Sequence, residues 1–382
     1  MAADTPFFSR LVYTFRAMTI LLILCVVLLS FANGANDNFK GVATLWGSGL
    51  TTYQRAIAWA TGFTFLGSLA AIWLGSALAA KFSGAKFVDA AIAAQLPFLI
   101  AVALGAGCTV LLAARLGLPI STTHSITGAL MGAGVAAAGF SHVKFAALGK
   151  GVVLPLLFSP VAALVLTVCV QLLLKRFGWA DGISDCVCLD EPQMVALAAN
   201  ASASTMVISA PPTLRVAPST ECNSGVEIAK FSIANGVHWF SAAAISFARG
   251  LNDTPKLVAV LLVAAAYNAR LNYMIVAVAI AIGGVLGAAR VARTLSKRIT
   301  PMATREAVTA NLIAATLVTL ASPFALPVST THVTSGGIFG IGLLRKEEAN
   351  WMKVREILVA WVATLPLGAA LAAVTFLLLR KP

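Results

Sequence analysis

Stretches without any charged residue divide much of the chain into segments long enough to cross a membrane. About 20 apolar residues are needed to span the hydrocarbon of a bilayer as a helix. The stretch 307–344 is 38 residues long and has room for two crossings. With the polar-interrupted segments around Asp37 and Asp253, the pattern predicts about ten crossings. The charge-free stretches that we interpret directly as spans are 56–80, 90–114, 116–143, 151–174, 271–289, 307–344 and 357–379.

A polar motif occurs twice, each time between apolar segments. The stretch Phe31-Ala-Asn-Gly-Ala-Asn-Asp-Asn-Phe-Lys-Gly-Val-Ala43 returns 216 positions later as Phe247-Ala-Arg-Gly-Leu-Asn-Asp-Thr-Pro-Lys-Leu-Val-Ala259, with 8 of 13 positions identical. A carboxylate at membrane depth is costly unless it faces a partner, an ion or water. A repeated aspartate in such a position therefore indicates a functional site.

A second motif repeats in the same order as the first. Leu118-Pro-Ile-Ser-Thr-Thr-His124 returns as Leu326-Pro-Val-Ser-Thr-Thr-His332, at an offset of 208. Two motifs repeated in a fixed order indicate two homologous halves, which is typical of secondary transporters. The sequence predicts an all-α polytopic membrane protein of two inverted-topology repeats, each of about five transmembrane segments, with broken or re-entrant helices at a midplane site. The expected divisions are a first membrane repeat 1–177, a cytoplasmic acidic linker 178–230 and a second membrane repeat 231–382.

Composition supports a multi-pass membrane protein and argues against a soluble one. The 382 residues are 59% hydrophobic and 11% charged, and the mean hydropathy is +0.90. The net charge of +13 comes from basic residues in short segments between spans, where positive charge marks the cytoplasmic face. We therefore expect no nucleic-acid partner and place the basic loop 290–305 in the cytoplasm. Counting crossings puts the linker there too and both termini outside, although Arg10, Arg16, Lys144 and Lys150 argue against this orientation.

The linker differs in composition from the spans. It holds six acidic residues and two basic ones, and Pro211-Pro212 and Pro218 favour a loop or a small subdomain outside the membrane. Cys186, Cys188 and Cys222 have no nearby histidine, so they are a weak zinc signal and we expect no metal site.

The first motif predicts an interruption of its helix. Gly34, Asn36 and Asp37 break the apolar pattern in the first copy, and Pro255 strengthens the expected break in the second, because proline removes a donor and kinks a helix. Unpaired backbone groups at membrane depth are tolerated where they line a cavity and can coordinate a ligand. A contact of small residues between helices is the alternative, and it leaves the repeated Asn-Asp pair unexplained.

The second motif predicts the start of a helix. Proline followed by hydroxyl side chains is typical of a helix N-terminus, and the free N–H groups there attract anions. Hydroxyl groups that merely cap a helix are the alternative. His124 and His332 are interpreted first as core histidines bonded to backbone, with proton carriage or anion donation left open. The hydroxyl groups that we expect to surround one anion from two sides belong to Ser121, Thr122, Thr123, Ser329, Thr330 and Thr331.

Both motifs together resemble those of the inorganic phosphate transporter (Pit) family. The resemblance rests on Gly34-Ala-Asn-Asp37, its copy Gly250-Leu-Asn-Asp253 and the two Pro-x-Ser-Thr-Thr-His segments, and it spans both halves. It implies a secondary transporter that carries phosphate with sodium or protons. It also implies that phosphate and the coupling cation are surrounded by Asn36, Asp37, Asn252, Asp253 and the two Ser-Thr-Thr segments.

One departure from the family pattern concerns the coupling ion. Lys40 and Lys256 follow the motif aspartates by three residues, at places where many relatives carry uncharged side chains. Residues at i and i+3 share a helix face, so each lysine can balance its aspartate or bind the anion. Arg249 replaces Asn33 of the first repeat and adds a cation near the second site. We therefore expect coupling to protons and not to sodium.

The sequence thus predicts a symporter of inorganic phosphate in the cytoplasmic (inner) membrane, working by alternating access. Sulfate or another oxyanion as substrate, and sodium as coupling ion, are the alternatives within this class; an anion channel or a binding protein is the alternative from another class. No enzyme activity is expected, because a Ser-His hydrolase needs an orienting carboxylate and an oxyanion hole. No cofactor is expected besides the coupling ion, H⁺ or Na⁺, and assembly of identical copies is left open.

Overall fold

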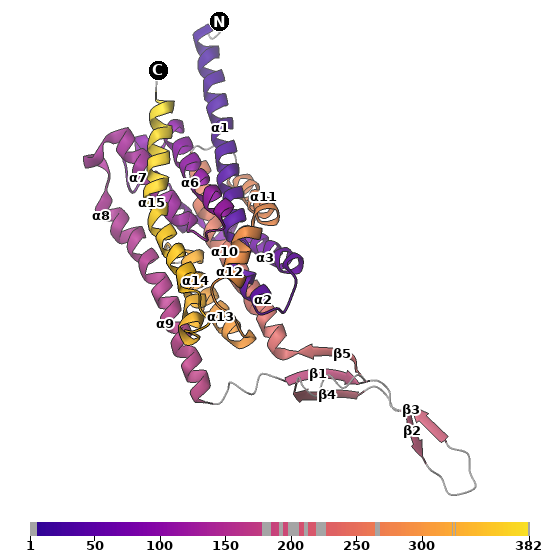
Figure 1. Cartoon of the computed structure of the whole chain (residues 1–382). Coiled ribbons are helices and arrows are strands. Elements are labelled where there is room, and N and C mark those ends of the chain that lie inside the picture. The colour runs from indigo at the N-terminus through magenta and orange to yellow at the C-terminus, as the bar shows by residue number, and fades with distance from the viewer. Residues whose placement is uncertain are drawn as a thin grey trace.

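A bundle of long helices forms most of the molecule (Figure 1). The structure is a computed structural model that describes residues 6–177, 185–190, 194–197, 206–209, 213–218, 227–263, 268–322, 324 and 326–380. The helices that precede the strands are α1 (Pro6–Asp37), the 3-10 turn η1 (Lys40–Val42), α2 (Ala43–Gly47), α3 (Tyr53–Leu74), α4 (Ser76–Lys81), α5 (Ala90–Ala93), α6 (Leu96–Leu116), α7 (Thr122–Ala138), η2 (Phe140–His142), α8 (Phe145–Leu148), the π-helical turn η3 (Gly149–Val153) and α9 (Leu154–Arg176).

Short strands and a second set of helices follow. The strands are β1 (Asp185–Asp190), β2 (Met194–Leu197), β3 (Met206–Ser209), β4 (Thr213–Pro218) and β5 (Glu227–Ser232). They form an antiparallel sheet in the order β4-β1-β5 and a β2-β3 hairpin, so the described part of the linker is a small β structure beside the bundle. The helices after them are α10 (Ile233–Val263), α11 (Ala269–Gly287), α12 (Ala289–Lys297), α13 (Thr304–Ala321), α14 (Thr330–Leu344) and α15 (Trp351–Leu379).

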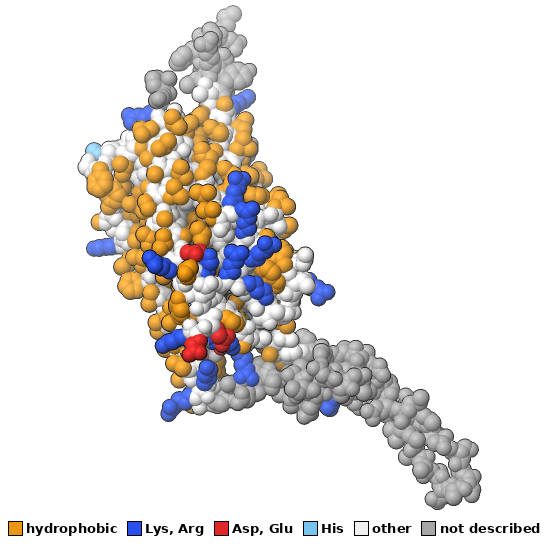
Figure 2. Space-filling model, viewed as in Figure 1, with side chains coloured by type: hydrophobic (Ala, Val, Ile, Leu, Met, Phe, Trp, Pro, Cys, Tyr) orange, Lys and Arg blue, Asp and Glu red, His pale blue; other side chains and the backbone are white. Residues whose placement is uncertain are grey.

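The outer surface of the helices is apolar. Large hydrophobic side chains such as Trp73, Phe158 and Val362 are 71%, 63% and 78% exposed, and hydrophobic side chains cover much of the bundle in Figure 2. Among the residues that the structure describes, six segments are long and apolar enough to cross a membrane: 14–47, 53–74, 96–116, 145–176, 269–287 and 351–379. The chain is therefore a multi-pass membrane protein with a helical membrane part, as the sequence predicts.

Basic side chains gather in a band across α12 on the face shown in Figure 2. Val291 and Leu295 of this helix are buried, whereas Arg290, Arg293 and Lys297 are exposed. A short helix with one apolar and one basic face suits a membrane–water interface.

Two packing contacts between the halves each occur twice, with the roles of the two halves exchanged. Helix α3 packs against α10 while α11 packs against α1, and α7 packs against α15 while α14 packs against α9. A close backbone approach at the motif glycine repeats as well: a Cβ on Gly34 would lie 2.1 Å from Ile280 O, and one on Gly250 would lie 2.1 Å from Thr64 O. In Figure 1, α9 runs toward the strands and α15 runs away from them. The repeated packing contacts and the opposite directions of α9 and α15 fit two copies that run in opposite directions.

The repeated Asn-Asp motif breaks its helix in the first half alone. Helix α1 ends at Asp37 and the chain turns through η1 into α2, as predicted. Helix α10 continues through Asp253 and Pro255 to Val263, so the predicted break in the second copy is wrong. A physical reason is the residue that follows the lysine: the first copy has Gly41, which disfavours a helix interior, and the second has Leu257, which favours it.

Both Ser-Thr-Thr-His segments begin helices inside the molecule. Ser121 Oγ accepts from His124 N at 3.2 Å, and Ser329 Oγ accepts from His332 N at 3.2 Å. These N-cap hydrogen bonds start α7 and α14, which have 17 and 15 residues. At about 1.5 Å per residue both helices are shorter than a bilayer core of about 30 Å. Neither helix alone is thus long enough to cross that core, and both begin at buried residues.

Candidate functional site

The two motifs of each half meet in one buried polar centre. It is formed by the end of α1 with η1, the middle of α10, and the N-termini of α7 and α14. Every side chain that the sequence predicts for the site is at most 4% exposed. We call this group the central cluster: Asn36, Asp37, Lys40, Ser121, Thr122, Thr123, Asn252, Asp253, Lys256, Ser329, Thr330 and Thr331, together with Asn33 and Arg249.

Asp37 accepts three hydrogen bonds. Its Oδ2 accepts from Asn33 Nδ2 and from Thr122 Oγ1, each at 3.0 Å. Its Oδ1 accepts from the ammonium of Lys40 and forms an ion pair with it. A carboxylate that is removed from water needs such partners to remain charged. The charge on Asp37 is therefore fully compensated in this state.

Lys40 joins the two halves. Besides Asp37, its ammonium donates to Asn36 Oδ1 and to Ile120 O, each at 3.0 Å. It also donates to Thr331 Oγ1 at the start of α14, and Thr331 Oγ1 donates to Ile120 O at 2.7 Å. One ammonium thus links α1, the loop before α7 and the first turn of α14.

Asp253 has a corresponding environment in the second half. Its Oδ1 lies 3.1 Å from Asn252 Nδ2 and 3.4 Å from Lys256 Nζ, and its Oδ2 accepts from Thr330 Oγ1 at 3.3 Å. Lys256 Nζ further donates to Val328 O and to Thr123 Oγ1, each at 3.0 Å. Lys256 therefore reaches the first turn of α7 as Lys40 reaches that of α14.

These contacts follow one rule in both halves. Each aspartate accepts from the first threonine of its own half, Thr122 or Thr330. Each lysine donates to the second threonine of the opposite half, Thr331 for Lys40 and Thr123 for Lys256. The sequence predicted that these residues share a site, and the structure adds which side chain meets which.

The two motif asparagines hold the loops that precede α7 and α14. Asn36 Nδ2 donates to Leu118 O at 2.9 Å, and Asn36 Oδ1 accepts from Ile120 N at 3.1 Å. Asn252 Nδ2 donates to Val328 O at 3.2 Å. The non-helical backbone at membrane depth is thereby satisfied by buried amides, as such backbone must be.

Arg249 breaks the symmetry of the cluster. Its guanidinium donates to Asn33 Oδ1 at 2.7 Å, to Asn38 Oδ1 at 2.9 Å and to Thr64 Oγ1 at 3.3 Å. Its Nε lies 3.7 Å from Asp253 Oδ2. The cluster contains three cationic side chains and two carboxylates, so its formal charge is one positive unit.

Sequence reasoning overlooked Asn33 as a partner of the first aspartate. Asn33 precedes Asp37 by four residues on α1, and residues at i and i+4 share a helix face. That spacing was the available signal. Asn38 and Thr64, which accept from Arg249, carried no signal of this kind because their role depends on how α10 packs against the end of α1 and against α3.

The two motif histidines, His124 and His332, each follow the second threonine of their motif, and their rings pack against each other. Their ring centroids are 4.6 Å apart, and the His332 ring stacks on Trp361 at 3.9 Å. His332 Nδ1 lies 3.2 Å from Leu156 O, and because a carbonyl can only accept, this nitrogen carries the proton. The contact agrees with the interpretation of His332 as a core histidine.

Comparison with known proteins places the chain among transporters. The model of the phosphate transporter family matches residues 33–372. A Bacillus subtilis protein named "Probable low-affinity inorganic phosphate transporter" is 26% identical over 385 residues, which cover 95% of this chain and 97% of the relative. A Rhizobium meliloti protein of the same name is 27% identical over 365 residues, covering 93% and 94%.

A solved structure has the same fold. It is titled "The sodium-dependent phosphate transporter" and superposes with a TM-score of 0.74 at 21% sequence identity. The match covers 95% of this chain and 99% of the other. At this identity the likeness concerns the fold alone.

Proposed function

Because this chain belongs to the phosphate transporter family, and is therefore a transporter and not an enzyme, we propose that it is a proton-coupled symporter of inorganic phosphate. We place it in the cytoplasmic membrane, with the linker 178–230 in the cytoplasm between two membrane repeats, 1–177 and 231–382. In this proposal the two repeats have inverted topology and expose the central cluster alternately to either side.

The observation that carries the proposal is the excess of one positive charge in the buried cluster. Lys40, Arg249 and Lys256 stand against Asp37 and Asp253, and all five are at most 4% exposed. An uncompensated charge at membrane depth costs several kcal/mol. A monovalent anion such as dihydrogen phosphate would neutralise the cluster, whereas divalent sulfate would leave it negative. This balance favours phosphate over sulfate.

Phosphate is expected to bind between the second threonines of the two halves. In the present state the hydroxyl groups of Thr123 and Thr331 accept from Lys256 and Lys40. Both threonines also lie in the first turn of a helix, where free N–H groups and the helix dipole favour an anion. A phosphate placed there can accept from both hydroxyl groups and both ammonium groups at once.

The lysine contacts suggest how binding is linked to movement. Each lysine ties its own half to the opposite one, Lys40 to α14 and Lys256 to α7. When phosphate oxygens replace the threonines as acceptors, both ties between the halves are exchanged for contacts to the substrate. Alternating access would then follow from loss of these ties.

The positions of the lysines favour protons over sodium. An ion bound at Asp37 would lie within a few ångströms of the Lys40 ammonium, which already occupies Oδ1. At 4 Å and an effective dielectric constant of about 20, two like charges repel by about 4 kcal/mol. A proton adds no second ion to the site, because it titrates a group already present.

Uptake into proteoliposomes tests the function. Purified protein in sealed vesicles should accumulate radiolabelled phosphate when an inward proton gradient is imposed, and an equal sodium gradient at fixed pH should have no effect. Excess sulfate should compete poorly. Uptake that follows sodium and ignores the pH gradient would overturn proton coupling, and uptake of sulfate in preference to phosphate would overturn the substrate.

A further inference from the structure

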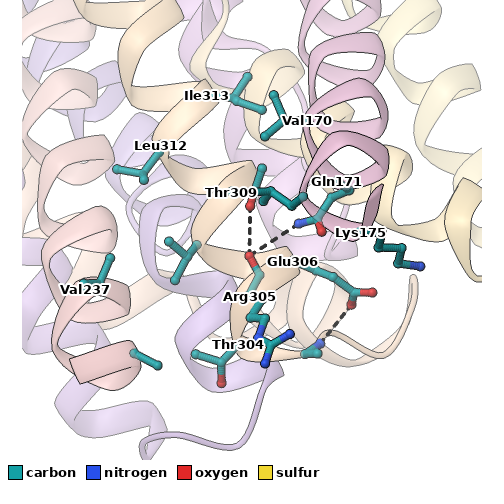
Figure 3. A pocket seen from close by; sticks show the side chains of 14 residues that line it. Val170, Gln171, Lys175, Val237, Thr304, Arg305, Glu306, Thr309, Leu312 and Ile313 are labelled. Carbon is teal, nitrogen blue, oxygen red and sulfur yellow. Dashed lines mark hydrogen bonds between the residues drawn. The ribbon is translucent and has the colours of Figure 1, made fainter. Parts of the chain in front are cut away.

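A cavity lies away from the central cluster, where α9, α10 and α13 meet (Figure 3). Its volume is about 490 Å³, within the range of about 300–1,000 Å³ that is typical of ligand pockets. It adjoins the end of α9 and the beginnings of α10 and α13. None of the residues that line it belongs to the central cluster.

The lining changes from apolar to charged along the cavity. Val170, Leu312 and Ile313 line one end, and Lys175 and Arg305 lie toward the other in Figure 3. Between them, Gln171 Nε2 donates to Arg305 O at 3.4 Å and Thr309 Oγ1 donates to the same oxygen at 3.0 Å. These polar groups are already paired. The cavity therefore suits a ligand with an apolar chain and a polar head.

The charged end of the cavity favours a negative head group. Its acidic residue, Glu306, accepts from Arg345 Nε at 3.1 and 3.0 Å and from Ala303 N at 3.1 Å. The hydrogen bonds to Glu306 raise the pKa of the Arg345 guanidinium. Since Arg345 neutralises Glu306, the ammonium of Lys175 gives this end of the cavity a positive charge.

The surroundings of the cavity face lipid. Val237 and Leu312, which line it, are 39% and 38% exposed, and Leu172 and Leu173 beside it on α9 are each 52% exposed. These apolar side chains lie on the outer surface of a membrane protein, so an acyl chain can reach the cavity from the bilayer. Lys175 lies in the last turn of α9, and Arg305 lies in the first turn of α13.

We propose that this cavity binds an anionic phospholipid of the leaflet on the linker side, with its phosphate at Lys175 and an acyl chain along Val170, Leu312 and Ile313. Basic pockets between transmembrane helices are suited to the head groups of anionic lipids. The site is independent of the substrate site, and its test requires no transport.

Native mass spectrometry of the purified full chain tests the proposal. Delipidated protein is titrated with phosphatidylglycerol or with phosphatidylcholine of the same chains, and the bound lipids are counted. We expect tighter binding of phosphatidylglycerol. Lys175→Gln should weaken it about fivefold, the effect of removing one basic residue near an anionic head group. Arg176→Gln is the matched control, because Arg176 is the exposed neighbour outside the lining and should change little.

A second variant tests the apolar end. Leu312→Trp places a larger side chain in the cavity and should reduce the number of tightly bound lipids while the protein remains monodisperse. Equal retention of both lipids would overturn the proposal, as would equal losses in Lys175→Gln and Arg176→Gln. Displacement of the lipid by millimolar inorganic phosphate would overturn it as well, because a phosphate site without a chain site would then explain the binding.

Discussion

The buried pair of Asp37 and Lys40 allows a quantitative test of whether the central cluster is functional or merely structural. Both side chains are about 1–2% exposed, and they form an ion pair at i, i+3. Removing one partner of a buried pair leaves an uncompensated charge and typically costs about 3–5 kcal/mol. Asp37→Asn and Lys40→Met should each lower the free energy of unfolding by about this amount. The double variant should cost much less than the sum, since it leaves neither charge alone.

A second lysine–carboxylate pair of the same spacing, with a glutamate in place of the aspartate, serves as the control. Lys353 and Glu356 also form an ion pair at i, i+3, but their side chains are 20% and 46% exposed. Exposed pairs contribute about 0–1 kcal/mol, so the cycle of Lys353→Met and Glu356→Gln should show little coupling. The free energies are measured by reversible unfolding in mixed micelles, with phosphate uptake recorded for every variant.

The two readouts separate stability from function. We expect the Asp37/Lys40 double variant to regain most of its stability and yet to remain inactive, because the carboxylate and the ammonium both act on substrate or coupling ion. Coupling at Asp37/Lys40 no larger than at Lys353/Glu356 would refute the reasoning about burial. Normal uptake by the double variant would refute the functional role of the pair.

Three further variants test other parts of the account. Thr331→Ala should weaken apparent phosphate affinity by about 0.5–1.5 kcal/mol per hydrogen bond lost, or more where the partner is charged, whereas Thr109→Ala, which loses an intrahelical bond to Gly105 O, should leave affinity unchanged in a binding assay. Gly34→Ala should lower the yield of folded protein in size-exclusion chromatography, because its Cβ would lie 2.1 Å from a backbone oxygen, and Gly62→Ala, with nothing within 4 Å, should not. Arg249→Gln removes the excess positive charge and should weaken phosphate binding about tenfold, equivalent to about 1.4 kcal/mol; unchanged binding would contradict the charge argument.

Much of the fold could be predicted from the sequence because membrane-spanning helices require long stretches of apolar residues without charge. Charge-free stretches predict the spans, and the internal repeat makes α10 the counterpart of α1 and α14 the counterpart of α7. The strands of the linker carried no comparable signal: proline and polar residues favoured a loop or small subdomain without distinguishing the two. The break at the motif was predicted for both copies, but α10 continues through it; the second copy has Leu257, a better helix former, where the first has Gly41.

The sequence predicted which polar residues would lie together, but it did not predict which side chain would contact which. Repetition identified the aspartates, lysines and threonines, since buried polar residues that recur need a common reason. Sequence spacing cannot say that Lys40 reaches Thr331 in the opposite half, because that contact depends on how α1 and α14 pack. The same limit applies to Arg249, whose partner Asn33 lies 216 residues away.

The most direct test of the central claim is to locate the bound anion. Arsenate has the tetrahedral shape and protonation of phosphate, and its arsenic atom can be found by anomalous X-ray diffraction in crystals of the full chain. We predict a single strong peak between Thr123 and Thr331, with the ammonium groups of Lys40 and Lys256 turned from these hydroxyl groups toward the anion. Arsenate bound elsewhere, with both lysine–threonine contacts intact, would contradict the account.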